Sequence, residues 1–198
     1  MISPSPELYL IRHGETEWSR AGRHTGRTDL PLTARGEREA AALRTLLAER
    51  RFALVLTSPL QRARETCRLA GLGSQAQLVP DLMEWDYGAY EGCTAEEIRS
   101  RAPGWLLWTN DVPDGETAAQ VGVRARRVID LASQAPGDVA LFAHGHVLRI
   151  LAACWVGLPP QEGRRLALGT ASIGILATEG GGRIIRRWNL PAEAVAPS

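Results

Sequence analysis

The stretch LYLIRHGETEWS, residues 8–19, joins an apolar run to a dense group of polar side chains. The apolar run predicts a buried strand over residues 8–12, and the polar residues Arg12 to Thr16 lie where that strand ends. Ligands of open α/β sheets bind outside the carboxyl ends of the strands. We therefore expect chemistry at this strand end, with Arg12 and His13 as the first candidates.

Short apolar runs alternate with longer amphipathic segments along the rest of the chain. We expect further strands at residues 53–57, 77–80, 139–143, 172–177 and 183–188. Helices are expected at residues 34–50, 118–133 and 147–156. This alternation is typical of βαβ units and predicts an α/β protein.

Local signals predict where several elements begin and end. Three capping-box patterns, at Ser58–Gln61, Thr94–Glu97 and Thr117–Gln120, each predict the start of a helix. The glycines at 180–182 suit the turn of a final hairpin. The last ten residues predict a loose tail.

The composition limits the function classes open to the chain. Its 198 residues, 44% hydrophobic and 23% charged, suit one domain with a sizeable core and exclude a disordered chain. A net charge of +1 argues against a dedicated nucleic-acid binder, which usually has a strongly basic face. No apolar run reaches the ~20 residues that a membrane span needs, and we expect no signal peptide.

The cysteines and the basic residues carry further information. Cys67, Cys93 and Cys154 lie too far apart in sequence to indicate a disulfide framework or a metal site, so we expect a reducing compartment and a cytoplasmic location. All 23 basic residues are arginines. Every permanently charged basic side chain is thus a planar guanidinium, whose paired N–H groups suit phosphate or carboxylate.

The segment at about 81–116 is the least regular part of the sequence. It holds five of the eleven Trp, Tyr and Phe residues: Trp85, Tyr87, Tyr90, Trp105 and Trp108. Such an aromatic excursion between two strands predicts either a lid or the ordinary core packing of a wide connection. Both interpretations stay open at this point.

Three of the four histidines fall at predicted strand ends, at positions 13, 144 and 146. Arg62 falls in the first turn of the helix after the second strand, close to Ser58. Each of these residues alone is more often structural, but together they place two arginines and a helix N-terminus near histidines. Such a pocket favours an anion, and phosphate suits the paired N–H groups of guanidinium best.

A metal site is the alternative for the same histidines. His144 and His146 have a spacing that ligands can have, and Glu84 or Asp86 could add a carboxylate. Two arginines beside them would repel a divalent cation, so we expect no metal and no other cofactor.

The strand-end motifs resemble those of the histidine phosphatase superfamily, which includes phosphoglycerate mutases and many acid phosphatases. The matching stretches appear in the family's order and span nearly the whole chain: LIRHGETEWS (10–19), HTGRTDLPLT (24–33), TSPLQRARET (57–66), LMEWDYGAYEG (82–92), PDGET (113–117) and AHGHVLR (143–149). Their details look most like sedoheptulose bisphosphatase and a group of bacterial acid phosphatases.

The resemblance implies one histidine phosphatase domain over residues 1–198. Its fold would be a three-layer α/β/α sandwich with a mostly parallel six-stranded sheet and one antiparallel edge strand. A lid at about 81–116 stays one of the two interpretations of that segment.

The resemblance also implies roles for the strand-end residues. His13 would be the nucleophile that forms a phosphohistidine, and Arg12, Arg62 and His144 would hold the phosphoryl oxygens. Glu84 would protonate the leaving oxygen and then deprotonate the attacking water. The residues alone do not distinguish Glu84 from Asp86 or Glu91 in this role. The expected substrate contacts are Ser19, Thr25, Gly26, Ser58, Tyr87, Gly145 and Arg149.

The function that follows is metal-independent hydrolysis of small phosphorylated metabolites, sugar phosphates above all. A cofactor-dependent phosphoglycerate mutase is the first alternative, and a non-catalytic binder of phosphorylated ligands is the second. Mutases carry a longer, basic insertion before the PDGET motif, whereas only about twenty residues separate that motif from Gly92 here. We expect no nucleic-acid or membrane partner, and a homodimer is the open alternative to a monomer.

Overall fold

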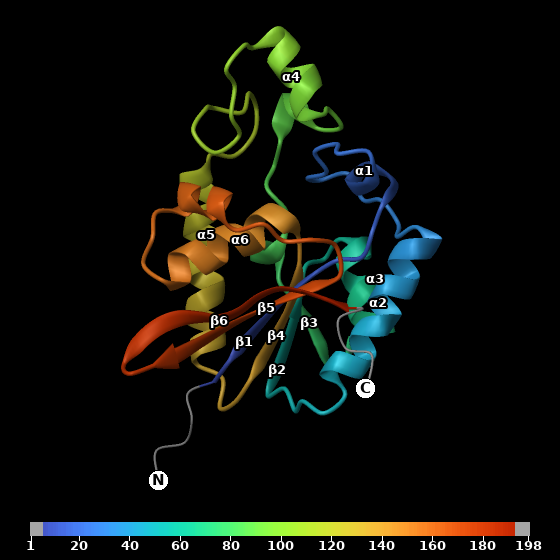
Figure 1. Cartoon of the computed structure of the whole chain (residues 1–198), viewed down its shortest axis with the longest axis vertical. Helices are drawn as coiled ribbons and strands as arrows, with labels where there is room; N and C mark the ends of the chain where they lie inside the picture. The colour runs from blue at the N-terminus through green and yellow to red at the C-terminus, as the bar shows by residue number, and fades with distance from the viewer. Residues whose placement is uncertain (1–5, 193–198) are drawn as a thin grey trace.

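A six-stranded sheet forms the centre of the computed structural model, which describes residues 6–192 (Figure 1). Its strands are β1 (Leu8–Arg12), β2 (Leu54–Thr57), β3 (Ala76–Leu78), β4 (Val139–Ala143), β5 (Ser172–Glu179) and β6 (Gly182–Pro191). They lie in the order β3-β2-β4-β1-β5-β6. The first four are parallel, whereas β5 pairs antiparallel with β1, and β6 antiparallel with β5.

The expected α/β fold class is confirmed, and the six strands lie close to their expected positions. The antiparallel part of the sheet is a hairpin of two strands, β5 and β6, that turns at Gly180 and Gly181. The strand β6 continues to Pro191, so the first residues of the expected tail are part of the sheet. Residues 193–198 of that tail lie outside the described residues.

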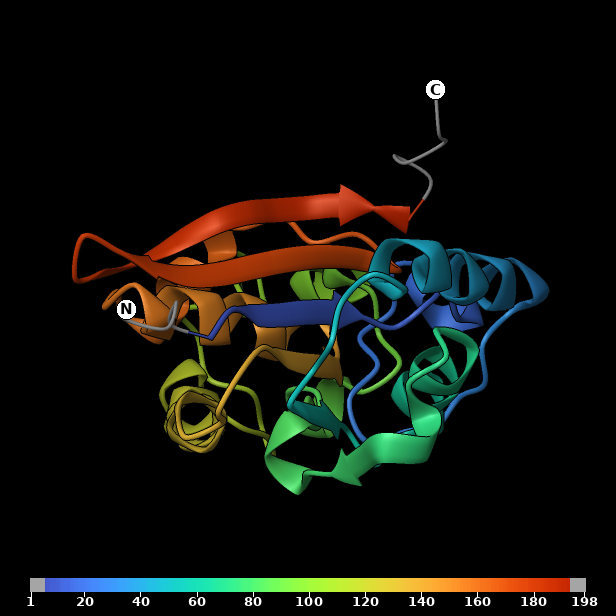
Figure 2. The same ribbon diagram turned by 90° about the horizontal axis from the view of Figure 1, so that it is seen from below.

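Helices cover both faces of the sheet (Figure 2). The α-helices are α1 (Glu17–Arg20), α2 (Ala34–Leu47), α3 (Gln61–Leu69), α4 (Ala95–Arg101), α5 (Ala118–Ser133) and α6 (Gly145–Trp155). Short 3₁₀ helices lie at Gly73–Gln75, Pro80–Leu82, Gly88–Tyr90 and Pro160–Arg165.

The two faces of the sheet follow from the alternation of side chains along β1. Leu8 and Leu10 belong to a core with residues of α5 and α6, whereas Tyr9 and Ile11 belong to a second core with residues of α2 and α3. Successive side chains of a strand point to opposite faces. A strand buried on both faces therefore reads as a continuous apolar run, as β1 and β4 do.

Two of the three predicted helix starts are confirmed. Thr94 and Thr117 each cap a helix within a complete capping box. The prediction for Ser58 is wrong, since α3 begins at Gln61 and Leu60 provides no side-chain cap. The Gln61 N–H donates to the Asp29 carboxylate at 2.8 Å, so a distant loop caps this helix, whereas the Ser58 hydroxyl bonds the Leu60 N–H and the His144 ring.

The segment at 81–116 rises with α4 above the carboxyl ends of the parallel strands (Figure 1). Trp85, Tyr87 and Trp105 in it are buried, which favours core packing for these aromatic residues. Movement of the segment as a lid stays a prediction. Within residues 6–192, every helix is too short or too polar to cross a membrane.

Candidate functional site

A pocket of about 180 Å³ opens at the carboxyl end of β1, beside the N-terminus of α6. Its lining comes from five separate parts of the chain. These residues are Arg12, His13, Ser19, Gly22, Arg23, His24, Thr25, Glu84, Tyr87, Gly145, His146, Arg149 and Leu168.

His13 lies at the base of this pocket with one ring nitrogen already bonded. Its Nδ1 lies 2.7 Å from the Gly14 carbonyl oxygen and must donate to it, which leaves Nε2 with the lone pair. Burial lowers the pKa of His13 well below its usual value, and the charges of Arg62 and Arg12 lower it further. A neutral imidazole with a free lone pair is the form that can act as a nucleophile.

Two glycines fix the loop that follows His13. A Cβ at Gly14 would lie 2.3 Å from the Gly36 carbonyl oxygen, and a Cβ at Gly36 would lie 2.1 Å from the Glu15 carbonyl oxygen. Only residues without a side chain permit this approach of α2 to the loop. The Gly14 N–H also donates to the Thr66 hydroxyl, so both α2 and α3 hold the main chain beside His13.

Arg12 presents an unsatisfied donor beside His13. One terminal nitrogen donates to the Leu168 carbonyl at 2.5 Å, while the buried Nε has no hydrogen-bond partner among the described residues. Its guanidinium packs against Gly145, where even a Cβ would come within 3.3 Å. A buried cationic donor without a hydrogen-bond partner lowers the stability of the fold, and a bound anion would remove this cost.

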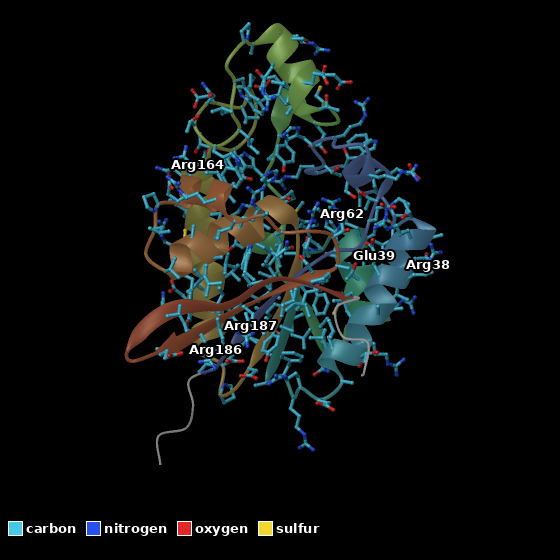
Figure 3. All side chains as sticks on the ribbon, in the orientation of Figure 1. Arg38, Glu39, Arg62, Arg164, Arg186 and Arg187 are labelled. Atoms are coloured by element: carbon cyan, nitrogen blue, oxygen red, sulfur yellow. The ribbon has the colours of Figure 1, made fainter. Side chains whose placement is uncertain are left out.

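Arg62 and His144 lie behind the pocket and do not line it (Figure 3 labels Arg62). Both are fully buried. The Arg62 Nε donates to the His144 Nδ1 at 3.1 Å, so the His144 Nε2–H faces the Ser58 hydroxyl at 2.8 Å. The other Arg62 bonds go to main-chain carbonyls of Thr25, Gly26 and Thr28.

Burial also sets the charge state of His144. It lowers the pKa of this imidazole well below its usual value, and the Arg62 charge lowers the pKa further. The rings of His13 and His144 have centroids 5.2 Å apart. His13 and Arg12 at the pocket are therefore backed by a second neutral imidazole, His144, and a second guanidinium, Arg62.

The Glu84 carboxylate lies on the N-terminus of α6. One of its oxygens accepts from the Trp85 and Val147 N–H groups and the other from the His146 N–H, each at 2.9 Å. Free N–H groups at a helix N-terminus bind anions. Glu84 is thus held in one orientation on the pocket wall, within the same cavity as His13.

The other two carboxylates that sequence left open serve the main chain and surface pairs. Asp86 forms an ion pair with Arg27 and accepts from the Gly88 N–H. Glu91 accepts from the N–H groups of Gly26 and Thr28. Neither lines the pocket.

A second pair of histidines forms the upper wall of the pocket. His24 and His146 are stacked with ring planes 8° apart and centroids at 6.3 Å. The His24 Nδ1 donates to the Cys93 carbonyl, and the His146 Nδ1 shares a hydrogen bond of 2.5 Å with the Tyr87 hydroxyl. Burial lowers the pKa of His146 and raises that of Tyr87, so this hydrogen bond joins two neutral groups.

The sequence-predicted contacts divide into two groups. Ser19, Thr25, Tyr87, Gly145 and Arg149 line the pocket, whereas Gly26 and Ser58 lie behind it. Sequence reasoning missed His24, Arg23, Gly22 and Leu168, and it placed His146 at a strand end near the anion pocket without giving it a role toward the substrate. The histidine before Thr25 in the HTG motif was the signal for His24.

Known proteins match this chain over nearly all of its length. The family described as "Histidine phosphatase superfamily (branch 1)" matches residues 8–191. The chain belongs to the histidine phosphatase superfamily. The resemblance of its motifs to this family is thereby confirmed.

Relatives with phosphatase names are similar over the whole fold. The Mycobacterium tuberculosis "Acid phosphatase" is 45% identical over 89% of this chain and 88% of its own length. The Saccharomyces cerevisiae "Sedoheptulose 1,7-bisphosphatase" is 37% identical over 82% of this chain and 72% of its own. The mycobacterial glucosyl-3-phosphoglycerate phosphatase, solved in complex with VO3, is 29% identical with a TM-score of 0.84, over 93% of this chain and 99% of that one.

The buried histidines of this histidine phosphatase predict that it loses stability in mild acid. His13, His144 and His146 have pKa values below the usual 6.5, so the unfolded chain binds more protons than the folded one as the pH falls below 6.5. Stability therefore falls as the pH is lowered. The free energy of unfolding in urea should drop by at most about 4 kcal/mol between pH 7.5 and 5.5.

A His13→Gln variant is the control for this measurement. It removes one of the three histidines, so about a third of the pH-dependent loss should disappear. Equal pH dependence in the variant and the parent would contradict the assignment of a buried neutral His13.

Proposed function

We propose that this histidine phosphatase hydrolyses small phosphorylated metabolites, sugar phosphates above all, through a phosphohistidine on His13. The observation that carries the proposal is the neutral imidazole of His13, whose Nε2 keeps its lone pair beside the unpartnered Arg12 Nε. The names of the relatives support the substrate class, since one refers to a sugar bisphosphate and another to a phosphoglycerate that carries a glucosyl group.

In the first step the His13 Nε2 attacks phosphorus and the bond to the leaving oxygen breaks. Glu84, in its protonated form, gives its proton to that oxygen, and the product alcohol leaves. Glu84 then takes a proton from a water that attacks the phosphohistidine. Inorganic phosphate leaves, and His13 recovers its neutral form.

Arg12, Arg62 and His144 hold the phosphoryl oxygens in this proposal. Arg12 has a free donor for this task, whereas Arg62 and His144 lie one layer deeper with most donors engaged. Fixed cations of this kind stabilise the charge that spreads over the equatorial oxygens.

The upper wall of the pocket supports recognition of the rest of the substrate. The Nδ1 atoms of His24 and His146 are engaged with the Cys93 carbonyl and the Tyr87 hydroxyl, which leaves the Nε2 atom of each ring for the substrate. Two ring nitrogens of this kind suit the hydroxyl groups of a sugar. Arg149, whose guanidinium lies 4.6 Å from the centroid of the Trp108 ring, adds a cation at the rim.

The alternatives have less support. The relatives at 45% and 37% identity carry phosphatase names, which disfavours a mutase. A non-catalytic binder would not need a nucleophile and a carboxylate in one pocket. A homodimer and the lack of nucleic-acid affinity stay predictions, and the unpaired cysteines support a cytoplasmic location.

Assays with chelator and with vanadate test this proposal. The arginines occupy the electrostatic role that a metal would otherwise take, so release of phosphate from p-nitrophenyl phosphate should survive exhaustive chelation. Vanadate, which can adopt the five-coordinate geometry of the transition state, should inhibit the reaction. Activity lost with chelator and restored by zinc or magnesium would contradict the proposal.

A further inference from the structure

The segment that carries Glu84 has little regular structure to hold it. Residues Met83 to Tyr87 belong to no helix or strand. The Glu84 side chain is bound by α6, but this fixes the carboxylate only if the main chain below it is fixed as well. Something else must therefore hold the main chain.

Arg124 of α5 holds this stretch of main chain, and all five of its N–H donors are used. One terminal nitrogen donates to the carbonyls of Asp81 and Met83, and the other donates to the Glu84 carbonyl at 3.1 Å. The Nε and the second terminal nitrogen bind the Glu116 carboxylate, each at 2.9 Å. Arg124 is 8% exposed, although it does not line the pocket that holds His13 and Glu84.

Glu116 binds the main chain on the C-terminal side of Glu84. Its carboxylate accepts from the Asp86 N–H at 2.9 Å, and its main chain exchanges further bonds with Trp85 and Asp86. The Arg124–Glu116 pair thus binds the main chain on both sides of Glu84 and of Trp85. A surface ion pair has no need of such connections.

We propose that Arg124, with Glu116, is the positioning pair for the general acid: it sets where Glu84 stands relative to His13 without touching the substrate. This inference rests on the role proposed for Glu84. Displacement of a catalytic group by about 1 Å can cost ~10²-fold in rate. Loss of the pair should therefore reduce acid catalysis while the nucleophile, held by β1, α2 and α3, stays in place.

Arg124→Lys is the main test, because lysine keeps the charge opposite Glu116 but lacks the planar fork. Phosphoenzyme formation is measured before the steady state with glucose 6-phosphate, whose alkoxide needs a proton, and with p-nitrophenyl phosphate, whose phenolate does not. The variant should lose about 10²-fold with the first substrate and only a few-fold with the second. Glu116→Gln should show the same preference, and it provides the second test if Arg124→Lys fails to fold.

Arg127→Lys is the matched control on the same helix. Arg127 is exposed and binds only the Asp81 carboxylate, so its replacement should leave both rates unchanged. In the double variant Arg124→Lys/Glu84→Gln, the loss with glucose 6-phosphate should be no greater than in Glu84→Gln alone, since both changes disable one proton transfer.

Two results would overturn the positioning role. One is an equal loss with both substrates in Arg124→Lys and in Glu116→Gln, and the other is a multiplied loss in the double variant. If Glu84→Gln itself affects both substrates equally, then Glu84 is not the acid and the proposed function fails at that step. If Glu84→Gln discriminates between them and the Arg124 and Glu116 variants do not, only the positioning role fails.

Discussion

Replacing His13 with alanine should lower kcat on every phosphomonoester by roughly 10⁴-fold or more, because no other group in the pocket can divide the reaction into two steps. The measurement is steady-state release of phosphate, combined with rapid quenching of the parent enzyme and labelled substrate. In the parent, the label should be on His13, stable to alkali and lost in acid.

His24→Ala is the matched control, since His24 lines the same pocket and also bonds a main-chain carbonyl through Nδ1. It should raise KM for sugar phosphates and keep most of kcat. A label on another residue, or no burst with a good leaving group, would rule out the phosphohistidine. A His13→Ala variant with near-parental kcat would do the same.

Replacing Glu84 with glutamine should slow phosphohistidine formation from a sugar phosphate by ~10²–10⁴-fold, the range of general acid catalysis. The amide oxygen can still accept from the N–H groups of Trp85 and Val147, whereas the amide nitrogen cannot accept from the His146 N–H, so the variant keeps two of the three hydrogen bonds. Formation from p-nitrophenyl phosphate should change much less, because nitrophenolate leaves without a proton. Phosphohistidine should then accumulate with that substrate, since the base that activates water is also lost.

Glu91→Gln provides the comparison for Glu84→Gln. Glu91 is also a carboxylate that accepts from main-chain N–H groups in a neighbouring loop, but it lies outside the pocket. Its replacement should affect both substrates alike. An equal loss for both substrates in Glu84→Gln would mean that Glu84 organises the site and donates no proton.

The sheet could be predicted because its central strands are buried on both faces. Such strands read as unbroken apolar runs, and the short runs at 8–12 and 139–143 correspond to β1 and β4 residue for residue. The helix starts at Thr94 and Thr117 could also be predicted, since both bonds of a capping box lie within four residues.

Features that depend on distant partners could not be read in this way. Ser58 matches a capping pattern, but Asp29 caps that helix and His144 binds the Ser58 hydroxyl. His24 follows no strand, and the fold brings it beside His146 through the Cys93 carbonyl. The depth of Arg62 and His144 behind the pocket is likewise a result of packing around the whole site.

The contact between Gly14 and Gly36 has a consequence for protein engineering. Exchanging a helical glycine for alanine is a standard route to thermostability and gains up to about 1 kcal/mol in an ordinary helix. At Gly36, within α2, the added methyl group would collide with the Glu15 carbonyl next to the nucleophile loop. A library that ranks variants by helix propensity would favour Gly36→Ala. The substitution would displace the loop that carries His13, so turnover would fall although Gly36 does not contact the substrate.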